Sequence, residues 1–210
     1  MIVELMGLHA GWLTLGAGLA AGADVILIPE FPYDMKLVVN AILDRKRAGR
    51  NFSLVAVAEN ARSQELVDFV ERAARLKAQR EAEGTQEVDQ EVERISSSYS
   101  GETMLLARRL REETGLETRI TILGSLVRGG TPTAADRLLA TQLAEWSALM
   151  VVNGQFGRMA RRLNDQMGSV PLEEVVDRHK VIPPDHAWIR GAYQVGTCLG
   201  VVPPITVPLL

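Results

Sequence analysis

The chain has 210 residues, of which 47% are hydrophobic and 23% are charged, as expected for a globular protein with a buried core. The net charge is −3 and no block of five like charges occurs, so we expect neither a nucleic-acid-binding protein nor one that binds an anionic membrane. The one cysteine, Cys198, excludes an internal disulfide framework and favours a reducing cytoplasm.

The first third of the chain alternates short apolar runs with segments of helical spacing. Residues 2–5, 25–28 and 52–57 are predicted strands, and residues 12–23 and 35–47 are predicted helices. The aliphatic run at 25–28 is unbroken, which is typical of a strand covered on both faces. This alternation predicts an α/β protein with a mostly parallel sheet.

The composition shifts at Arg62, where a highly charged stretch begins. Residues 64–94 carry apolar side chains on one face only, which predicts a long solvated helix or a pair of helices. Thr133 and Asp136 are expected to cap a helix. The remaining expected elements are a helix at 103–113, a strand at 120–123, helices at 134–152 and 172–179, and a Pro-rich surface tail at 201–210.

Candidate binding residues follow the predicted strands. Met6 and Gly7 lie at a strand-to-helix turn, where backbone amides suit anions and sugar hydroxyls, although glycine there also permits tight packing. Glu59 follows the strand 52–57 at the edge where open α/β sheets bind ligands. Its carboxylate is either an acceptor for hydroxyl groups, a helix cap or a solvated loop residue.

Two arginines bracket the predicted strand at 120–123. Arg128 is followed by two glycines, and a guanidinium group pairs with phosphate through two hydrogen bonds. Arg119 and Arg128 are therefore candidates for a phosphate clamp, with a plain turn as the alternative. The chain contains no Walker A motif and no Gly-x-Gly-x-x-Gly after a strand.

A series of motifs then appears in a fixed order. After Met6-Gly7 come Gly-Ala-Asp-Val-Ile-Leu-Ile-Pro-Glu30, Val-Ala-Glu59, Glu-Thr-Arg119 and Leu-Gly-x-x-x-Arg-Gly-Gly-x-Pro-x-x-x-Asp-Arg137. This series resembles the substrate-binding half of the 6-phosphofructokinase family. The resemblance runs from Ile2 to about Gly200, apart from an insertion at about 62–103.

The resemblance implies a Rossmann-like three-layer α/β/α substrate-binding domain of the phosphofructokinase fold. This domain is expected to be incomplete and to carry a long charged helical insertion. It would span residues 1–126, with the insertion at 62–103. A helical segment at 127–177 would pack on a donor-binding half, and residues 178–210 would return to the first domain and end in the Pro-rich tail.

The family reaction transfers a phosphoryl group from ATP or pyrophosphate to fructose 6-phosphate, with Mg²⁺, and gives fructose 1,6-bisphosphate. By position, Met6 and Gly7 would contact the sugar through their backbone, and Glu59 would bind a furanose hydroxyl. Arg128 would hold the substrate, and Arg119 would reach the 6-phosphate of a neighbouring subunit's substrate. The resemblance thus implies an oligomer, and it implies glycolysis in the cytoplasm.

Two further residues resemble an effector site, and three depart from the family pattern. Asp24 and Arg50 stand where allosteric bacterial members place effector-site residues. Leu8 replaces an arginine that helps to hold the transferred phosphoryl group, Ser125 replaces a histidine, and Val127 replaces a glutamine. These three changes remove a cation and polar contacts, which count against full activity.

The donor loop and the Thr-Ile-Asp-x-Asp segment of the family, which lie upstream of the matching region, are not found in this sequence. We therefore expect no catalytic residue and no Mg²⁺ ligand here, and little activity from this chain alone. Three interpretations follow: a split product that works with a separate N-terminal half, a noncatalytic homologue with a regulatory or interaction role, or a truncated enzyme. The residues that distinguish ATP from pyrophosphate as donor lie outside the sequence.

Overall fold

The computed structural model describes residues 1–83 and 101–203, and side chains for all of these except 76–83. The described chain forms two compact units. The first comprises Met1–Val127 together with Val181–Leu210, and the second comprises Arg128–Lys180.

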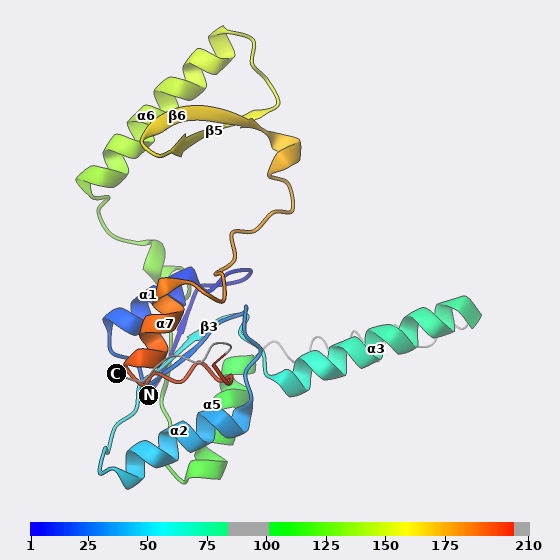
Figure 1. Cartoon of the computed structure of the whole chain (residues 1–210), viewed down its shortest axis with the longest axis vertical. Coiled ribbons are helices and arrows are strands. Elements are labelled where there is room, and N and C mark those ends of the chain that lie inside the picture. The colour runs from blue at the N-terminus through cyan, green and yellow to red at the C-terminus, as the bar shows by residue number, and fades with distance from the viewer. Residues whose placement is uncertain (84–100, 204–210) are drawn as a thin grey trace. The chain divides into compact units, whose positions relative to one another are not determined.

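A parallel four-stranded sheet forms the centre of the first unit (Figure 1). Its strands are β1 (Ile2–Leu5), β2 (Val25–Leu27), β3 (Val55–Ala58) and β4 (Ile120–Ile122). Their spatial order is β2-β3-β1-β4, so β1 pairs with both β3 and β4. The predicted parallel sheet is confirmed, and all residues of β2 and β3 are buried, as their aliphatic runs indicate.

Helices cover both faces of this sheet. On one face lie α1 (Trp12–Ala20) and α7 (Ala187–Gln194), and on the other lie α2 (Met35–Arg47) and α5 (Glu102–Thr114). Two separate apolar clusters result, because alternate residues of a strand point to opposite faces. Ile2 joins the cluster on the α2 and α5 face, whereas Leu5 joins the cluster on the α1 and α7 face. The predicted three-layer α/β/α architecture is therefore confirmed.

The insertion begins with a long helix, α3 (Gln64–Glu83). This helix confirms the first part of the stretch predicted at 64–94. The rest of that stretch, from residue 84 onward, lies outside the described residues, as does most of the tail predicted at 201–210.

Near the C-terminus one predicted helix is wrong and another helix was missed. The amphipathic helix expected at 172–179 is only a short 3₁₀ helix, η2 (Leu172–Glu174), because Asp177 has a positive φ of 58° that an α-helix cannot contain. Conversely, α7 was not predicted. It is eight residues long and contains Gly191, so its local signal is weak, and burial of Ile189 and Ala192 against the sheet stabilises it.

The second unit contains a helix and a two-stranded hairpin. Helix α6 (Ala134–Val152) matches its predicted bounds and begins with the expected cap, in which Thr133 and Asp136 each accept a hydrogen bond from the other's backbone N–H. The hairpin joins β5 (Arg158–Leu163) and β6 (Gln166–Pro171). The helical segment expected at 127–177 therefore also contains a hairpin, which was not predicted.

The hairpin turn explains this missed element. Asn164 and Asp165 have φ angles of 49° and 61°, the conformation of a two-residue type I′ turn. The flanking strands carry Arg158, Arg161 and Arg162 and lack a clear alternation of apolar residues, so the turn was the only local signal.

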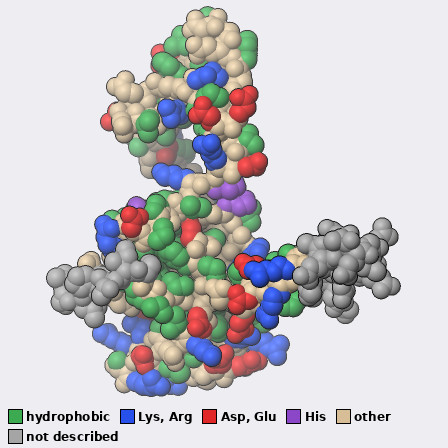
Figure 2. Space-filling model, turned by 45° about the vertical axis from the view of Figure 1, so that its right-hand side comes forward, with side chains coloured by type: hydrophobic (Ala, Val, Ile, Leu, Met, Phe, Trp, Pro, Cys, Tyr) green, Lys and Arg blue, Asp and Glu red, His purple; other side chains and the backbone are tan. Residues whose placement is uncertain are grey.

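The surface gives two further observations. Among the described helices, none combines the length and the apolar character needed to cross a membrane. On the face of the first unit drawn in Figure 2, acidic and basic side chains are interspersed rather than gathered by sign.

Candidate functional site

The connections that leave β1 and β3 diverge at the carboxyl edge of the sheet. Strand β1 leads into α1 on one face, whereas β3 leads into α3 and α5, and α5 covers the other face. Because β1 and β3 are neighbours, their following loops open a crevice between them, which is where open α/β sheets bind ligands. Met6 and Gly7 follow β1, and Glu59 follows β3.

A hydrogen bond joins the two loops at this crevice. The N–H of Gly7 donates to Oε1 of Glu59, with an N···O distance of 3.2 Å. A second bond runs from Nδ2 of Asn60 to the carbonyl oxygen of Leu8, at 2.7 Å. A methyl group at Gly7 would lie 2.9 Å from Cβ of Ala58, so the loop approaches the end of β3 more closely than a side chain permits.

Glu30 fixes the other end of the loop after β1. The N–H of Gly11, at the start of α1, donates to both Glu30 carboxylate oxygens at 3.1 Å, and the N–H of Ile182 donates to Oε1 at 2.9 Å. The carboxylate therefore joins the loop to the returning C-terminal segment. Glu30 had no predicted role, although its place directly after the buried strand β2 and Pro29 is a signal of the same kind as that of Glu59.

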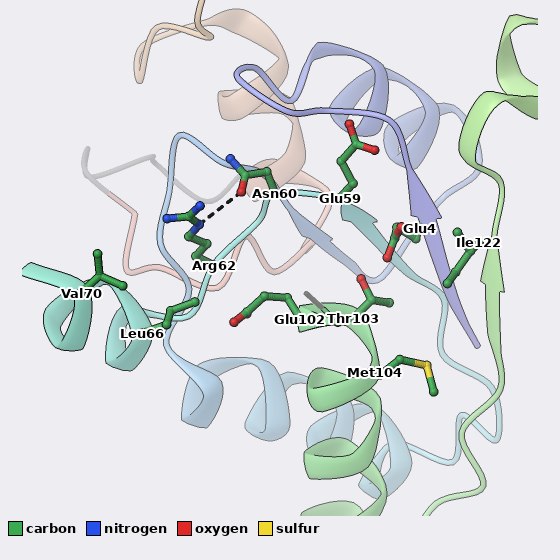
Figure 3. A pocket seen from close by; sticks show the side chains of 11 residues that line it. Glu4, Glu59, Asn60, Arg62, Leu66, Val70, Glu102, Thr103, Met104 and Ile122 are labelled. Atoms are coloured by element: carbon green, nitrogen blue, oxygen red, sulfur yellow. Dashed lines mark hydrogen bonds between the residues drawn. The ribbon is translucent and has the colours of Figure 1, made fainter. Parts of the chain in front are cut away.

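A pocket of about 480 Å³ opens beside Glu59, on the face of the sheet covered by α5 (Figure 3). Its volume lies within the usual range of small-molecule sites. The polar part of its wall comprises Glu4, Glu59, Asn60, Arg62, Glu102 and Thr103. The apolar part comprises Leu66, Val70, Met104 and Ile122.

The lining of the pocket contains more acidic than basic side chains. Three carboxylates, those of Glu4, Glu59 and Glu102, face one guanidinium, that of Arg62. Burial raises the pKa of Glu102, while a backbone hydrogen bond from Ser63 and the charge of Arg62 oppose this rise. Oε1 of Glu102 is buried and has no hydrogen-bond partner among the described residues. This oxygen is therefore an acceptor that the described residues leave unpaired.

Within the described residues, no group of three or more His, Cys, Asp or Glu side chains is arranged to hold a metal ion. The three pocket carboxylates thus do not form a metal site. The described residues therefore do not fit Mg²⁺.

Comparison with known proteins identifies the family of the chain. The phosphofructokinase family profile matches residues 1–151. The ATP-dependent 6-phosphofructokinase of Propionibacterium freudenreichii subsp. shermanii is 46% identical over 206 residues, covering 95% of this chain and 54% of that protein.

The chain belongs to the phosphofructokinase family. The ATP-dependent 6-phosphofructokinase of Spirochaeta thermophila is 42% identical over 200 residues, covering 95% of this chain and 50% of that enzyme. The chain thus spans about half the length of the curated relatives it matches.

Solved phosphofructokinase structures share the fold. The enzyme of Pichia pastoris in the T-state superposes with a TM-score of 0.54 at 32% identity, over 84% of this chain and 17% of that one. The pyrophosphate-dependent phosphofructokinase of Marinobacter aquaeolei superposes with a TM-score of 0.63 over 94% of this chain and 44% of that one. Because the identity to the latter is 20%, it shows the fold alone.

The two arginines of the phosphofructokinase pattern flank β4 in the sequence. Arg119 precedes β4 and is therefore at the amino edge of the parallel sheet, whereas Glu59 is at the carboxyl edge. Its exposed side chain pairs with Glu117 at 2.9 Å. Arg128 ends the 3₁₀ helix η1 (Gly124–Arg128), which follows β4, and it begins the second unit.

The two residues that resemble a phosphofructokinase effector site both contact Arg45. The carboxylate of Asp24 pairs with the Arg45 guanidinium at 2.9 Å and accepts a hydrogen bond from the N–H of Leu54 at 2.8 Å. The backbone N–H of Arg50 donates to the carbonyl oxygen of Arg45 at 2.9 Å, and its side chain is exposed. Leu8, the departure beside Gly7, is also exposed.

Proposed function

We propose that this chain supplies the fructose 6-phosphate site of a phosphofructokinase. The reaction would transfer a phosphoryl group from ATP or pyrophosphate to the sugar, giving fructose 1,6-bisphosphate in glycolysis. Membership of the family supports this proposal. The observation that carries it is the hydrogen bond between Gly7 and Glu59 at the divergence of β1 and β3.

Each proposed contact uses the chemistry of its residue. One Glu59 oxygen accepts from Gly7, which fixes the carboxylate and leaves acceptor capacity for a sugar hydroxyl. The backbone of Met6 and Gly7 would contact the sugar beside it. Arg128 would hold the substrate phosphate through the two parallel hydrogen bonds that a guanidinium forms with phosphate oxygens.

The remaining parts of the reaction would come from other chains or segments. Arg119 is exposed at the opposite edge of the sheet, which suits a contact with the phosphate in a neighbouring subunit of a homo-oligomer. We propose that a donor-binding half carries the catalytic base and the Mg²⁺ ligands, because phosphoryl transfer depends on positioning both reactants. Such an assembly would work in the cytoplasm, and Asp24 and Arg50 would form its effector site.

The direct test is thermal unfolding of the chain with increasing fructose 6-phosphate. A ligand that binds the folded state at about 100 times its Kd stabilises the fold by about 2.7 kcal/mol. Glu59→Gln keeps an acceptor oxygen for Gly7 but removes the charge. Because a hydrogen bond to a charged group contributes about 1.5–3 kcal/mol, we expect affinity to fall by about 10- to 100-fold.

The matched control is Glu112→Gln, the same change on an exposed residue of α5 that pairs with Arg108 at the surface. It should leave the affinity unchanged. No stabilisation of the unmodified chain by fructose 6-phosphate, or equal affinity in the Glu59 variant, would contradict the proposal. A coupled assay for fructose 1,6-bisphosphate, with either donor and Mg²⁺, then tests whether the chain turns over alone.

A further inference from the structure

The two described ends of the insertion form one side of the pocket beside Glu59. Arg62, Leu66 and Val70 come from its beginning, and Glu102 and Met104 come from its end. The opposite side is the carboxyl edge of the sheet. In Figure 3 the Glu102 side chain extends from the start of α5 toward Arg62 and Leu66.

Tyr33 anchors both ends of the insertion. Its N–H donates to the carbonyl oxygen of Arg62 at 3.0 Å, and its carbonyl oxygen accepts from the N–H of Gln64 at 2.9 Å. The buried phenol interacts with the Glu102 carboxylate, and burial together with this carboxylate raises the pKa of Tyr33. These contacts thus fix the described ends of the insertion beside the pocket.

An ion pair holds the two helices of this wall together. Nη1 of Arg109 on α5 lies 2.6 Å from Oε2 of Glu65 on α3. This pair joins α3, which follows the start of the insertion, to α5, which begins at its end. It therefore keeps Leu66 and Met104 in the lining of one pocket. The wall is therefore positioned by contacts from both of its helices.

The charge of the pocket determines whether it can hold a phosphate group or a neutral part of a ligand. Three carboxylates outnumber the one guanidinium, and this excess of negative charge repels a phosphate dianion. The carboxylates are not arranged around a metal ion, as described above. The lining combines the acceptor oxygens of Glu59 and Glu102 with the apolar side chains of Met104 and Ile122. This combination fits a neutral ring that carries hydroxyl groups and has an apolar face.

We propose that the insertion provides a second wall of the sugar site, in which Glu102 and Arg62 bind hydroxyl groups and Met104 packs against the sugar ring. The buried Oε1 of Glu102 gains the hydrogen-bond partner that the described residues do not supply. The phosphate of the ligand points out of this pocket. This inference rests on the proposed function, and it assigns the insertion a role in choosing the sugar.

The test measures binding of three probes to the full chain: fructose 6-phosphate, D-fructose and inorganic phosphate. Met104→Ala and Glu102→Gln should each weaken both sugars by about 3- to 10-fold and leave phosphate binding unchanged. Leu105→Ala and Glu112→Gln, matched changes on α5 outside the pocket lining, should change none of the three affinities. Met104 is 59% exposed, so its variant folds whatever the effect of the Glu102 change.

The outcomes separate the two proposals. Sugar affinity that falls in Glu59→Gln but not in Met104→Ala or Glu102→Gln would overturn the second wall and leave the proposed function standing. Phosphate binding that falls with sugar binding in both wall variants would overturn the orientation of the ligand. No sugar binding by the unmodified chain would overturn the proposed function and this inference together.

Discussion

Replacing Gly11, at the start of α1, tests the conformation of the loop that carries Met6 and Gly7. A methyl group at Gly11 would lie 2.4 Å from Cβ and Cγ2 of Ile28 and 3.1 Å from Oε2 of Glu30. Ile28 is fully buried and branched at Cβ, so it cannot rotate away. Gly11→Ala must therefore move the loop or the strand, and it must disturb the hydrogen bonds from Gly11 to Glu30.

Overpacking of this kind lowers the free energy of unfolding by about 1–3 kcal/mol. For a chain of 210 residues, that corresponds to a fall in Tm of about 2–12 °C. Thermal unfolding followed by circular dichroism measures it. The affinity for fructose 6-phosphate should fall as well, because Gly11 lies in the same loop as Met6 and Gly7.

Gly191→Ala is the matched control. Gly191 lies within α7, has an ordinary helical φ, and a methyl group there would meet no atom within 4 Å. Replacing an unconstrained helical glycine with alanine should raise the free energy of unfolding by about 0.5–1 kcal/mol. If Gly11→Ala is as stable as the unmodified chain, or if both variants shift Tm in the same direction, the close approach of Gly11 to Ile28 is refuted.

Three further predictions concern charge and surface. Arg128→Ala should abolish phosphate binding, and unchanged affinity by calorimetry would remove Arg128 from the site. Because burial raises the pKa of Glu102 above its ordinary value of 4.5, the folded state holds this proton more tightly, and its contribution to stability falls as pH rises through the folded pKa. The Tm of Glu102→Gln minus the Tm of the unmodified chain should therefore increase as the pH rises from acid to neutral. A difference that does not change with pH would contradict this. Because Val152 and Phe156 are 82% and 74% exposed, the chain should self-associate, and sedimentation as a monomer at all concentrations would refute it.

The sequence predicted most elements whose signal is local. The bounds of α2 and α6 match their predicted ranges, because helical spacing and end signals lie within each segment. The parallel sheet follows from aliphatic runs separated by helices. The order of the glycine, glutamate and arginine motifs was enough to indicate the family.

Elements that depend on tertiary burial were missed. Helix α7 is stabilised by packing of Ile189 and Ala192 on the sheet, and the β5–β6 hairpin is stabilised by cross-strand pairing. Neither has a strong signal within its own residues. The helix expected at 172–179 is the opposite case. Its local pattern is suitable for a helix, but the positive φ of Asp177 interrupts it.

The same division applies to the candidate site. The sequence alone placed Gly7 and Glu59 after strands, and it determined the family of the chain. Only the tertiary structure decided that β1 and β3 are neighbours, so that Gly7 and Glu59 bond to each other, and that Glu102 returns to their side after the insertion. The physical reason is that strand order and the path of a long connection depend on which buried surfaces meet, and no short window of sequence contains that information.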